Sequence, residues 1–354
     1  MSAVDVVIPC YNYGRYLEGC VEAILRQAGV DVRVLIIDDA SSDETPEIGA
    51  RLAERDPRVT FRRHTKNCGH ILTYNEGLLG WASAEYSLLI SADDLLAPGA
   101  LARATQLMDR HPDVGMTYGF AEYFSDPAHP ASVEAPRSAE SQVIPGRQFL
   151  QRCFEHGNAV STPTAVVRTR VQQAVGGYSV ELPHSGDMEM WMRFAIRGPI
   201  GVIRAVQAFY RWHGNNMSHK YRTARLRDMK EVEQAADCVI AAAAGCFSEI
   251  GAWRAAMHRR FAAEAFWIAS TAFDIGDAET YRIALAYAEH TDPALRGAAI
   301  WWKLRTKALL GPTVWRTVRP TLDCLRGIRD RPNARWTPPR DGQTFGWWPA
   351  DLAR

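Results

Sequence analysis

The sequence predicts an α/β fold in its first 220 residues, with a mostly parallel central sheet flanked by helices, followed by an α-helical region. Three observations support this prediction. Short β-branched runs alternate with helical spacing, two of these runs end in paired acids, and the composition shifts to alanine, arginine and aromatic residues from Tyr221 onward. Alternating strands and helices are typical of doubly wound parallel sheets, in which crossover helices cover the faces of the sheet.

The first 63 residues contain a βαβαβ pattern. The first strand should end at Pro9, because proline cannot donate a hydrogen bond to a sheet ladder. A polar turn with capping residues, which ends at Pro46, precedes the second helix. We expect strands over residues 4–9, 32–37 and 59–63, with helices over residues 16–27 and from the turn to residue 55.

The same alternation continues as far as residue 213. Residues 125–141 are rich in proline, alanine, serine and glutamate, and they are expected to form an exposed, mobile loop. We expect strands over residues 88–90, 114–123, 164–168 and 202–210, with helices over residues 72–81, 98–110 and 146–154 and from residue 188.

The stretch around which the chain is organised reads Leu-Leu-Ile-Ser-Ala-Asp-Asp-Leu-Leu, at residues 88–96. A buried strand that ends in Asp93 and Asp94 directs both acids out of the carboxyl edge of the sheet, where ligands of open α/β sheets bind. A hard divalent cation that holds a substrate diphosphate would relieve the repulsion between them. The alternative is a helix N-terminus at which Asp94 caps the helix and Asp93 is solvated.

A second pair of acids, Asp38 and Asp39, follows the second strand. An acid at such a strand end can accept from a base N–H or a ribose hydroxyl. Tyr11, in the loop after the first strand, can stack on the face of a base. The structural alternatives are that the tyrosine packs on the protein and that the aspartate caps a helix. For a motif taken alone, the structural and the functional interpretation have about equal weight.

Two further groups of side chains are candidates for a functional site. Asp187 lies at the start of a predicted helix, where it is either an N-cap or a carboxylate directed at the cleft as general base. Arg211 and His213 follow the last predicted strand, which delivers both to one place.

Composition and missing motifs exclude several classes of protein. The net charge is +1, with 47% hydrophobic and 23% charged residues, so we expect no nucleic acid partner. The seven cysteines include no C-x-x-C pair, and the start of the chain does not resemble a signal peptide, so a cytoplasmic location is expected. No G-x-G-x-x-G or G-x-x-x-x-G-K-[ST] motif follows the first strand, which argues against a dinucleotide-dependent enzyme and a P-loop NTPase.

We expect three regions: an α/β domain at residues 1–220, a helical domain at 221–330 and a loosely attached tail at 331–354. A lid or a homodimer surface is the preferred function of the helical domain. Residues 300–320 are basic and rich in tryptophan, as membrane-surface helices are, so peripheral contact with the inner membrane face is the alternative. The predicted helices of this domain cover residues 226–244, 253–273, 278–289 and 293–310.

Seven short motifs, in the expected order and spacing, resemble the family 2 glycosyltransferases, which have the GT-A (Rossmann-like) fold. The resemblance extends from about residue 4 to residue 218. The motifs are Val-Val-Ile-Pro-Cys-Tyr-Asn at residues 6–12, Ile-Ile-Asp-Asp-Ala-Ser-Ser-Asp at 36–43, Asn-Cys-Gly-His at 67–70, Leu-Ile-Ser-Ala-Asp-Asp at 89–94, Gly-Gly-Tyr at 176–178, Gly-Asp at 186–187 and Arg-Trp-His at 211–213.

The resemblance implies that residues 1–220 form a nucleotide-sugar-binding and catalytic domain, and it implies a role for each matching residue. Asp187 resembles the catalytic base that deprotonates the acceptor. Asp93 resembles the second acid of the D-x-D motif, which binds the Mn²⁺ or Mg²⁺ that holds the diphosphate, and His213 is expected to bind the same ion. Ser91, Asp94 and Arg211 are implied in donor and diphosphate binding. The residues implied in nucleotide binding are Pro9, Tyr11, Asn12, Asp38, Asp39 and Ala92.

Two positions depart from the family pattern. Ser91 stands where the first acid of the D-x-D motif is expected, which should weaken metal binding, and Gly186 stands where many members have glutamate. The implied function is inverting transfer of a sugar from a nucleotide-sugar, with UDP favoured over dTDP, to a carbohydrate, lipid-linked or other hydroxyl-bearing acceptor. The alternative is a catalytically silent nucleotide-sugar-binding scaffold. A nucleotidyltransferase is a weaker alternative, because the loop after the first strand lacks a basic, glycine-rich triphosphate motif.

Overall fold

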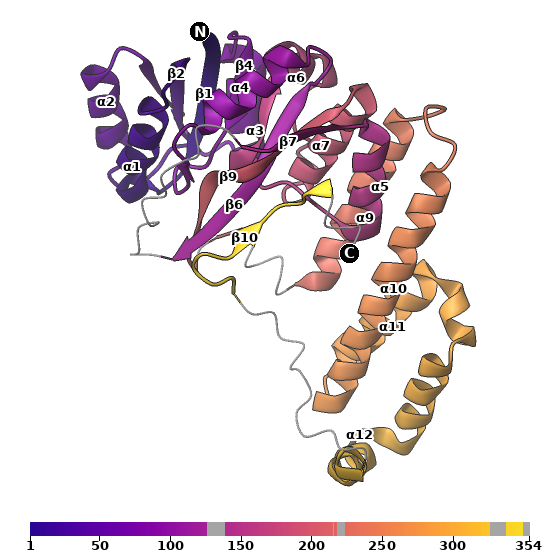
Figure 1. Ribbon diagram of the computed structural model, residues 1–354. Coiled ribbons are helices and arrows are strands. Elements are labelled where there is room, and N and C mark those ends of the chain that lie inside the picture. The colour runs from indigo at the N-terminus through magenta and orange to yellow at the C-terminus, as the bar shows by residue number, and fades with distance from the viewer. Residues whose placement is uncertain (126–138, 215, 218–223, 326–337, 350–354) are drawn as a thin grey trace. The chain divides into compact units, whose positions relative to one another are not determined.

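The chain divides into two compact units. The computed structural model describes residues 1–125, 139–214, 216–217, 224–325 and 338–349 (Figure 1). The first unit comprises residues 1–220, 231–247 and 338–354, and the second comprises residues 221–230 and 248–337. This division differs from the expected one, because residues 231–247 and the end of the chain belong to the first unit. Most of the predicted loop at residues 125–141 lies outside the described residues.

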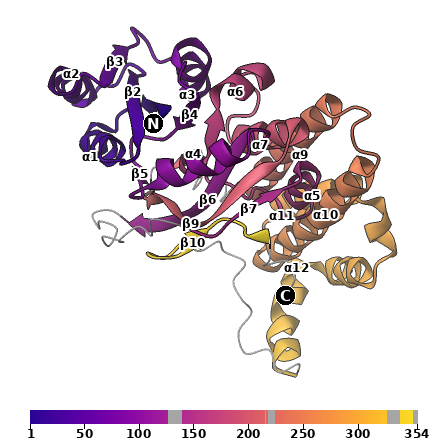
Figure 2. The ribbon, with the colours of Figure 1, turned by 45° about the horizontal axis from the view of Figure 1, so that its top comes forward.

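The centre of the first unit is a mixed sheet with the order β3-β2-β1-β4-β8-β6-β9-β5. In addition, β10 pairs with β6 and β7 pairs with β9 (Figures 1 and 2). The strands are β1 (Ser2–Cys10), β2 (Val30–Asp38), β3 (Val59–Arg63), β4 (Tyr86–Leu89), β5 (Leu95–Leu96), β6 (Met116–Ser125), β7 (Ser141–Ile144), β8 (Val166–Arg168), β9 (Ile200–Trp212) and β10 (Thr344–Phe345).

The predicted parallel arrangement of the first strands is confirmed. β1 pairs in parallel with β2 and β4, and β2 pairs in parallel with β3. β1 continues one residue past the expected end, to Cys10. Pro9 has no N–H to donate, but this interrupts no pairing with β4, because the last paired position between β1 and β4 is Val7–Leu89. β8 is antiparallel to both β4 and β6, whereas β9 is parallel to β6.

The helices of the first unit connect and cover these strands. The expected helix at residues 72–81 is α3 followed by a wider π-helical turn. The helical segments are α1 (Gly14–Leu25), α2 (Thr45–Arg55), α3 (His70–Asn75), the π-helix η1 (Glu76–Trp81), α4 (Ala100–Arg110), α5 (Gly146–His156), the 3₁₀ turn η2 (Thr162–Thr164), α6 (Thr169–Val175) and α7 (Gly186–Arg197).

β1 is buried on both of its faces, as a central parallel strand should be. Val6 and Ile8 are fully buried in one core cluster with Leu17 of α1 and with residues of α4. The opposite face carries Val7, which contacts Gly77 of η1 so closely that a Cβ on Gly77 would lie 2.3 Å from Val7 Cγ1. The close approach therefore requires glycine at this position.

The end of the chain is part of the sheet, so the expectation of a loosely attached tail is wrong for residues 338–349. β10 pairs antiparallel with Ala121 and Glu122 of β6. Trp347 and Trp348 are buried, and the Arg204 guanidinium lies 5.5 Å from the centre of a Trp348 ring. The physical reason is long-range strand pairing, which a composition rich in proline and arginine does not reveal.

The second unit is helical, as predicted. Its helical segments are α10 (Ile250–Ile275), α11 (Ala278–Thr291), the 3₁₀ turn η3 (Pro293–Gly297) and α12 (Ala299–Leu325), and α9 (Arg225–Ala242) begins in this unit. A non-helical Gly311 divides α12. Lys307 forms a buried ion pair with Asp274, which also accepts from Trp315 Nε1 at 2.8 Å.

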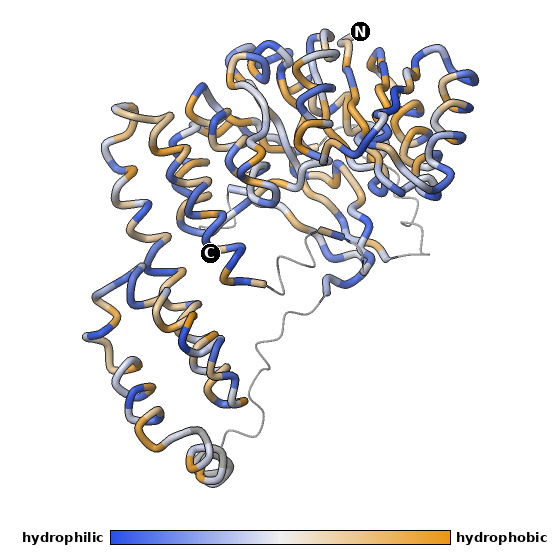
Figure 3. The backbone as a smooth tube through the Cα atoms, turned by 180° about the vertical axis from the view of Figure 1, so that it is seen from behind, coloured by the Kyte–Doolittle hydropathy of each residue, from blue (hydrophilic) through white to orange (hydrophobic). Residues whose placement is uncertain are grey.

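The helices of this unit mix polar and apolar residues along their length, as Figure 3 shows. On α12, the side chains of Trp302 and Leu309 are 60% and 87% exposed. No helix among the described residues is long and apolar enough to cross a membrane.

We expect Trp348→Ala to lower the free energy of unfolding of the first unit by about 3 to 5 kcal/mol, because removal of a buried indole leaves a cavity. Val180→Ala, at an exposed position of the same unit, should change it by less than about 0.5 kcal/mol. Urea unfolding of the full chain, followed by circular dichroism, measures both. Equal, small effects would contradict the assignment of Trp348 to the core.

Candidate functional site

Two buried acids lie at the carboxyl end of β4. Asp93 and Asp94 are only 4% and 3% exposed. The next helix, α4, begins at Ala100, and its N-cap residue is Gly99. The alternative in which Asp94 caps a helix and Asp93 is solvated is therefore wrong.

The end of β9 brings Arg211 and, one residue beyond the strand, His213 to these acids. The Arg211 backbone N–H donates to Asp94 Oδ1 at 3.0 Å, and Arg211 Nε donates to the Asp93 carbonyl oxygen at 2.9 Å. His213 Nε2 lies 3.1 Å from Asp93 Oδ2. Residues more than 100 positions apart in the sequence thus form one polar cluster, which we call the acid cluster: Asp93, Asp94, Arg211 and His213.

The electrostatics of the acid cluster favour a bound cation. Burial raises the pKa of Asp94, and the neighbouring Asp93 carboxylate raises it further. A divalent ion would relieve both effects. Asp93 could offer such an ion a carboxylate oxygen, and His213 could offer it an imidazole nitrogen. Ser91 is partly exposed and offers a hydroxyl without charge.

Aromatic rings that the sequence analysis did not single out surround the cluster. Tyr16 of α1 stacks on His213, with ring centres 5.7 Å apart, and Tyr13 meets the same imidazole edge-on at 5.5 Å. The Arg211 guanidinium lies 4.5 Å from the centre of the Tyr16 ring. These contacts hold the side chains of Arg211 and His213 in place. The helical spacing of residues 16–27 gave no indication of this role for Tyr16.

The loop after β1 is joined to the loop after β2. Asn12 has a left-handed backbone with φ of 58°. Its side-chain oxygen accepts from the Ser42 N–H at 2.9 Å, and its own N–H donates to Ser41 Oγ at 2.8 Å. Next to it, the Tyr11 side chain is 49% exposed and is open to stacking. Among the other residues expected to bind nucleotide, Pro9 is partly exposed and Ala92 is fully buried.

Asp38 and Asp39 are both buried and form internal contacts. Asp38 Oδ1 accepts from the Ser41 N–H at 2.9 Å, and Asp38 Oδ2 lies 3.1 Å from Arg63 Nε. Asp39 Oδ1 contacts His64 Nδ1 at 2.8 Å and accepts from the Cys68 N–H at 2.7 Å.

Asp39 is the better placed of the two to accept from a ligand. Its Oδ2 accepts from the Gly69 N–H at 2.9 Å. No other hydrogen bond to this oxygen occurs in the described part of the chain. Since a carboxylate oxygen has two acceptor positions, one remains.

Asp187 lies inside the first turn of α7, and the N-cap is Ser185, so the N-cap alternative is wrong. Asp187 Oδ1 accepts from the Met188 N–H at 2.6 Å, and Oδ2 accepts from Asn158 Nδ2 at 3.0 Å. Burial raises the pKa of Asp187 to about 6, although these hydrogen bonds and the nearby His184 oppose the shift. A carboxyl group with this pKa can exchange a proton near neutral pH.

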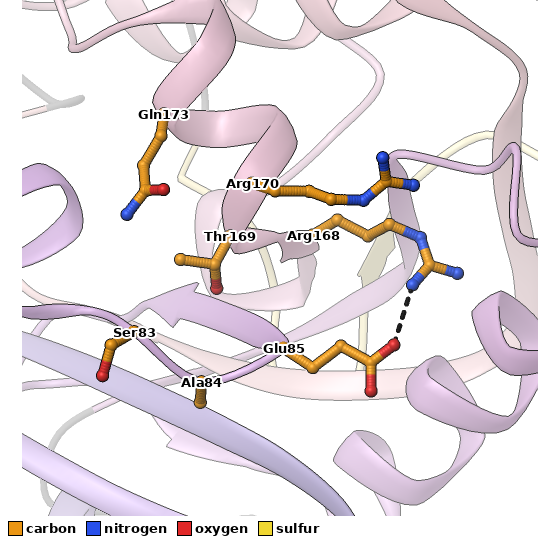
Figure 4. Close-up of a pocket in the computed structure, with 7 residues that line it drawn as sticks. All are labelled: Ser83, Ala84, Glu85, Arg168, Thr169, Arg170 and Gln173. Atoms are coloured by element: carbon orange, nitrogen blue, oxygen red, sulfur yellow. Dashed lines mark hydrogen bonds and ion pairs between the residues drawn. The ribbon is translucent and has the colours of Figure 1, made fainter.

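A separate pocket lies at the opposite end of β4 (Figure 4). Ser83 and Glu85 line it just before the strand begins, and Arg168 and Thr169 line it from the end of β8. Glu85 and Arg168 form an ion pair at 3.0 Å across it. Because the acid cluster lies past the carboxyl end of β4, this pocket is not part of that site.

Two polar partners of the expected site residues were missed from the sequence. His64, which contacts Asp39, lies one residue beyond β3, so the strand-end rule that identified the acids could have found it. Asn158, which donates to Asp187, lies two residues after α5, in a position with no local signal.

The comparisons with known proteins agree with this architecture. Residues 5–172 match the model of glycosyl transferase family 2. These residues belong to that family. The glycosyltransferase GlyG of Streptococcus pneumoniae is 30% identical over 34% of this chain and 40% of its own length. An uncharacterized protein of Mycobacterium tuberculosis is 27% identical over 56% of this chain and 64% of its own length. The chain thus spans about two fifths to two thirds of these curated relatives.

Solved structures confirm the GT-A fold. Residues 1–349 of S. aureus TarS, in complex with UDP-GlcNAc, align with a TM-score of 0.60 and 17% identity, covering 94% of this chain and 93% of that chain. The mannosyltransferase PcManGT from Pyrobaculum calidifontis, in complex with GDP-Man and Mn²⁺, aligns with a TM-score of 0.51 and 20% identity, covering 93% and 88%.

Asn12 tests the local geometry of this family 2 domain. Asn12→Ala should lower the free energy of unfolding by about 1 kcal/mol more than Asn12→Gly, because both lose the bond to Ser42 but only alanine resists the left-handed backbone. Urea unfolding of the two variants measures the difference. Equal stabilities would show that the backbone of residue 12 is not held at positive φ.

Proposed function

We propose that this chain is an inverting, metal-assisted glycosyltransferase that transfers a sugar from a nucleotide-sugar, preferably UDP-linked, to a hydroxyl-bearing acceptor. The observation that carries the proposal is the convergence of Asp93, Asp94, Arg211 and His213 at the carboxyl edge of the sheet. In the same unit, Asp187 has a pKa raised to about 6. The family of residues 5–172 supports the same reaction class.

The acid cluster would bind the diphosphate of the donor. Asp93 and His213 would hold Mn²⁺ or Mg²⁺, which stabilises the negative charge of the leaving diphosphate when it is bound. Arg211 adds a positive charge whose position is fixed by its bonds to the backbone of Asp93 and the carboxylate of Asp94. Ser91 would contribute a hydrogen bond only.

Asp187 would act as the general base. It removes the proton from the acceptor hydroxyl as the oxygen attacks the anomeric carbon, and Asn158 keeps the carboxylate in position by donating to Oδ2. A single displacement inverts the anomeric centre, so the reaction needs no covalent nucleophile.

Tyr11 would stack on the base, and Asp39 would accept from a base N–H through its remaining acceptor position. Uracil and thymine share that N–H. Asp38, Asn12, Pro9 and Ala92 belong to the same proposed nucleotide site.

The acceptor and the cellular setting are also part of the proposal. We propose a carbohydrate or lipid-linked acceptor, a cytoplasmic location and either dimerisation or peripheral membrane contact through the second unit. The exposed Trp302 and Leu309 and the nearby basic residues Lys303 and Arg305 support membrane contact.

Calorimetric titration with UDP, with and without Mn²⁺, tests the donor site. Mn²⁺ should increase the affinity of the wild-type chain for UDP at least about tenfold, and Asp93→Ala should abolish that increase, since it removes a proposed metal ligand. Glu85→Ala is the matched control, because it removes an acid at the opposite end of the same strand. No binding of UDP, GDP or dTDP would contradict the proposal and favour a silent scaffold.

The pH dependence of transfer tests the base. Because Asp187 acts as the carboxylate and its pKa is about 6, kcat/KM should be constant above that pH and fall about tenfold per unit well below it. Asp187→Asn should lose about 100-fold or more of the activity.

Asn158→Ala should shift this acid limb to higher pH, since it removes a hydrogen bond that favours the ionised form. Initial rates measured across about pH 5 to 8 test both variants. An active Asp187→Asn enzyme would rule out the assignment of the base.

A further inference from the structure

We infer that Asp39, His64 and Cys68 form a binding site for a thiophilic divalent cation of the Zn²⁺ class, separate from the acid cluster. We call these three residues the triad site. One ligand atom from each lies within 4.8 Å of the others. Among the described residues, no other group of three or more histidine, cysteine or acidic side chains has its ligand atoms this close together. Asp93, Asp94 and His213 do not form such a group.

The triad site is built by the ends of adjacent strands. Asp39 follows β2 and His64 follows β3, which pair in parallel and therefore end at the same edge of the sheet. The chain then turns back, and the N–H groups of Cys68 and Gly69 donate to the two oxygens of Asp39 at 2.7 and 2.9 Å. These bonds bring the Cys68 side chain to the carboxylate.

His64 has the arrangement of a metal-binding histidine. Its Nδ1 faces Asp39, and its Nε2 contacts Glu76 Oε2 at 2.8 Å. A metal-binding histidine usually contacts a carboxylate or carbonyl through its second nitrogen, which fixes the ring orientation. Glu76 would supply that contact here.

The chemistry of the ligands selects the ion. A thiolate and an imidazole favour Zn²⁺, whereas Mg²⁺ and Ca²⁺ require oxygen ligands. Binding would displace the thiol proton of Cys68 and the proton between His64 Nδ1 and Asp39 to the solvent. Three protein ligands leave a fourth position for water, as in zinc sites that remain open.

An ion in the triad site would prevent the nucleotide base from binding to Asp39. Asp39 is the carboxylate to which we assign base recognition, and an ion bound to it would take its acceptor position. This consequence rests on the proposed function, whereas ion binding itself does not. The two can therefore be tested separately.

The first experiment titrates Zn²⁺ into the full chain in the absence of nucleotide. The Asp93→Ala background is used so that the acid cluster does not contribute. We expect one ion per chain, with affinity reduced at least about tenfold by Cys68→Ser and by His64→Gln. Cys246→Ser, which removes an exposed cysteine elsewhere, is the matched control and should bind as before.

Co²⁺ provides a second readout, since a cobalt–thiolate bond gives a charge-transfer absorption. The absorption should be present with Cys246→Ser and absent with Cys68→Ser. Zn²⁺ binding that neither Cys68→Ser nor His64→Gln weakens, or the absence of stoichiometric binding, would overturn the inference.

Competition then tests the link to the nucleotide. Zn²⁺ should weaken Mn²⁺-dependent UDP binding to the wild-type chain at least about tenfold and should have little effect on Cys68→Ser, whose backbone bond to Asp39 is retained. Equal inhibition of both proteins would show that Zn²⁺ acts elsewhere and would overturn the proposed coupling.

Discussion

The site of this family 2 domain depends on the burial of two adjacent carboxylates, Asp93 and Asp94. Removing such charges from water costs several kcal/mol for each ion unless they are paired and hydrogen-bonded. The end of β9 provides the compensation, since Arg211 bonds to both residues and His213 reaches Asp93. The acids therefore hold the end of β9 in place, and this end in turn supplies the guanidinium and imidazole groups of the cluster.

Strand direction explains why these residues can meet. β8 is antiparallel to both of its neighbours, β4 and β6, so β4 and β6 run in the same direction. β9 is parallel to β6, and its carboxyl end therefore lies at the same edge as that of β4. Although β8 between them is antiparallel, the carboxyl ends of β4, β6 and β9 thus lie at one edge of the sheet, as they would in a fully parallel sheet.

The aspartates at this edge differ in their surroundings, and the surroundings set their chemistry. Asp39 accepts from the backbone at two positions and contacts His64, so it is suited to recognition and, in our inference, to metal binding. Asp94 is buried beside another acid and is compensated by Arg211. Burial raises the pKa of Asp187 to about 6 although His184 lies nearby, and this value suits Asp187 to proton transfer.

The sequence by itself determined the local elements and the residues that end them. Strand and helix periodicity depends on near neighbours, and the paired acids at the end of β2 and beyond β4 are visible as abrupt breaks in apolar runs. Only the tertiary structure placed Asn158 on Asp187, Tyr16 on His213 and β10 on β6. These contacts join segments that are distant in the sequence, and their energy comes from pairing and burial, which leave no periodic trace in the residues involved.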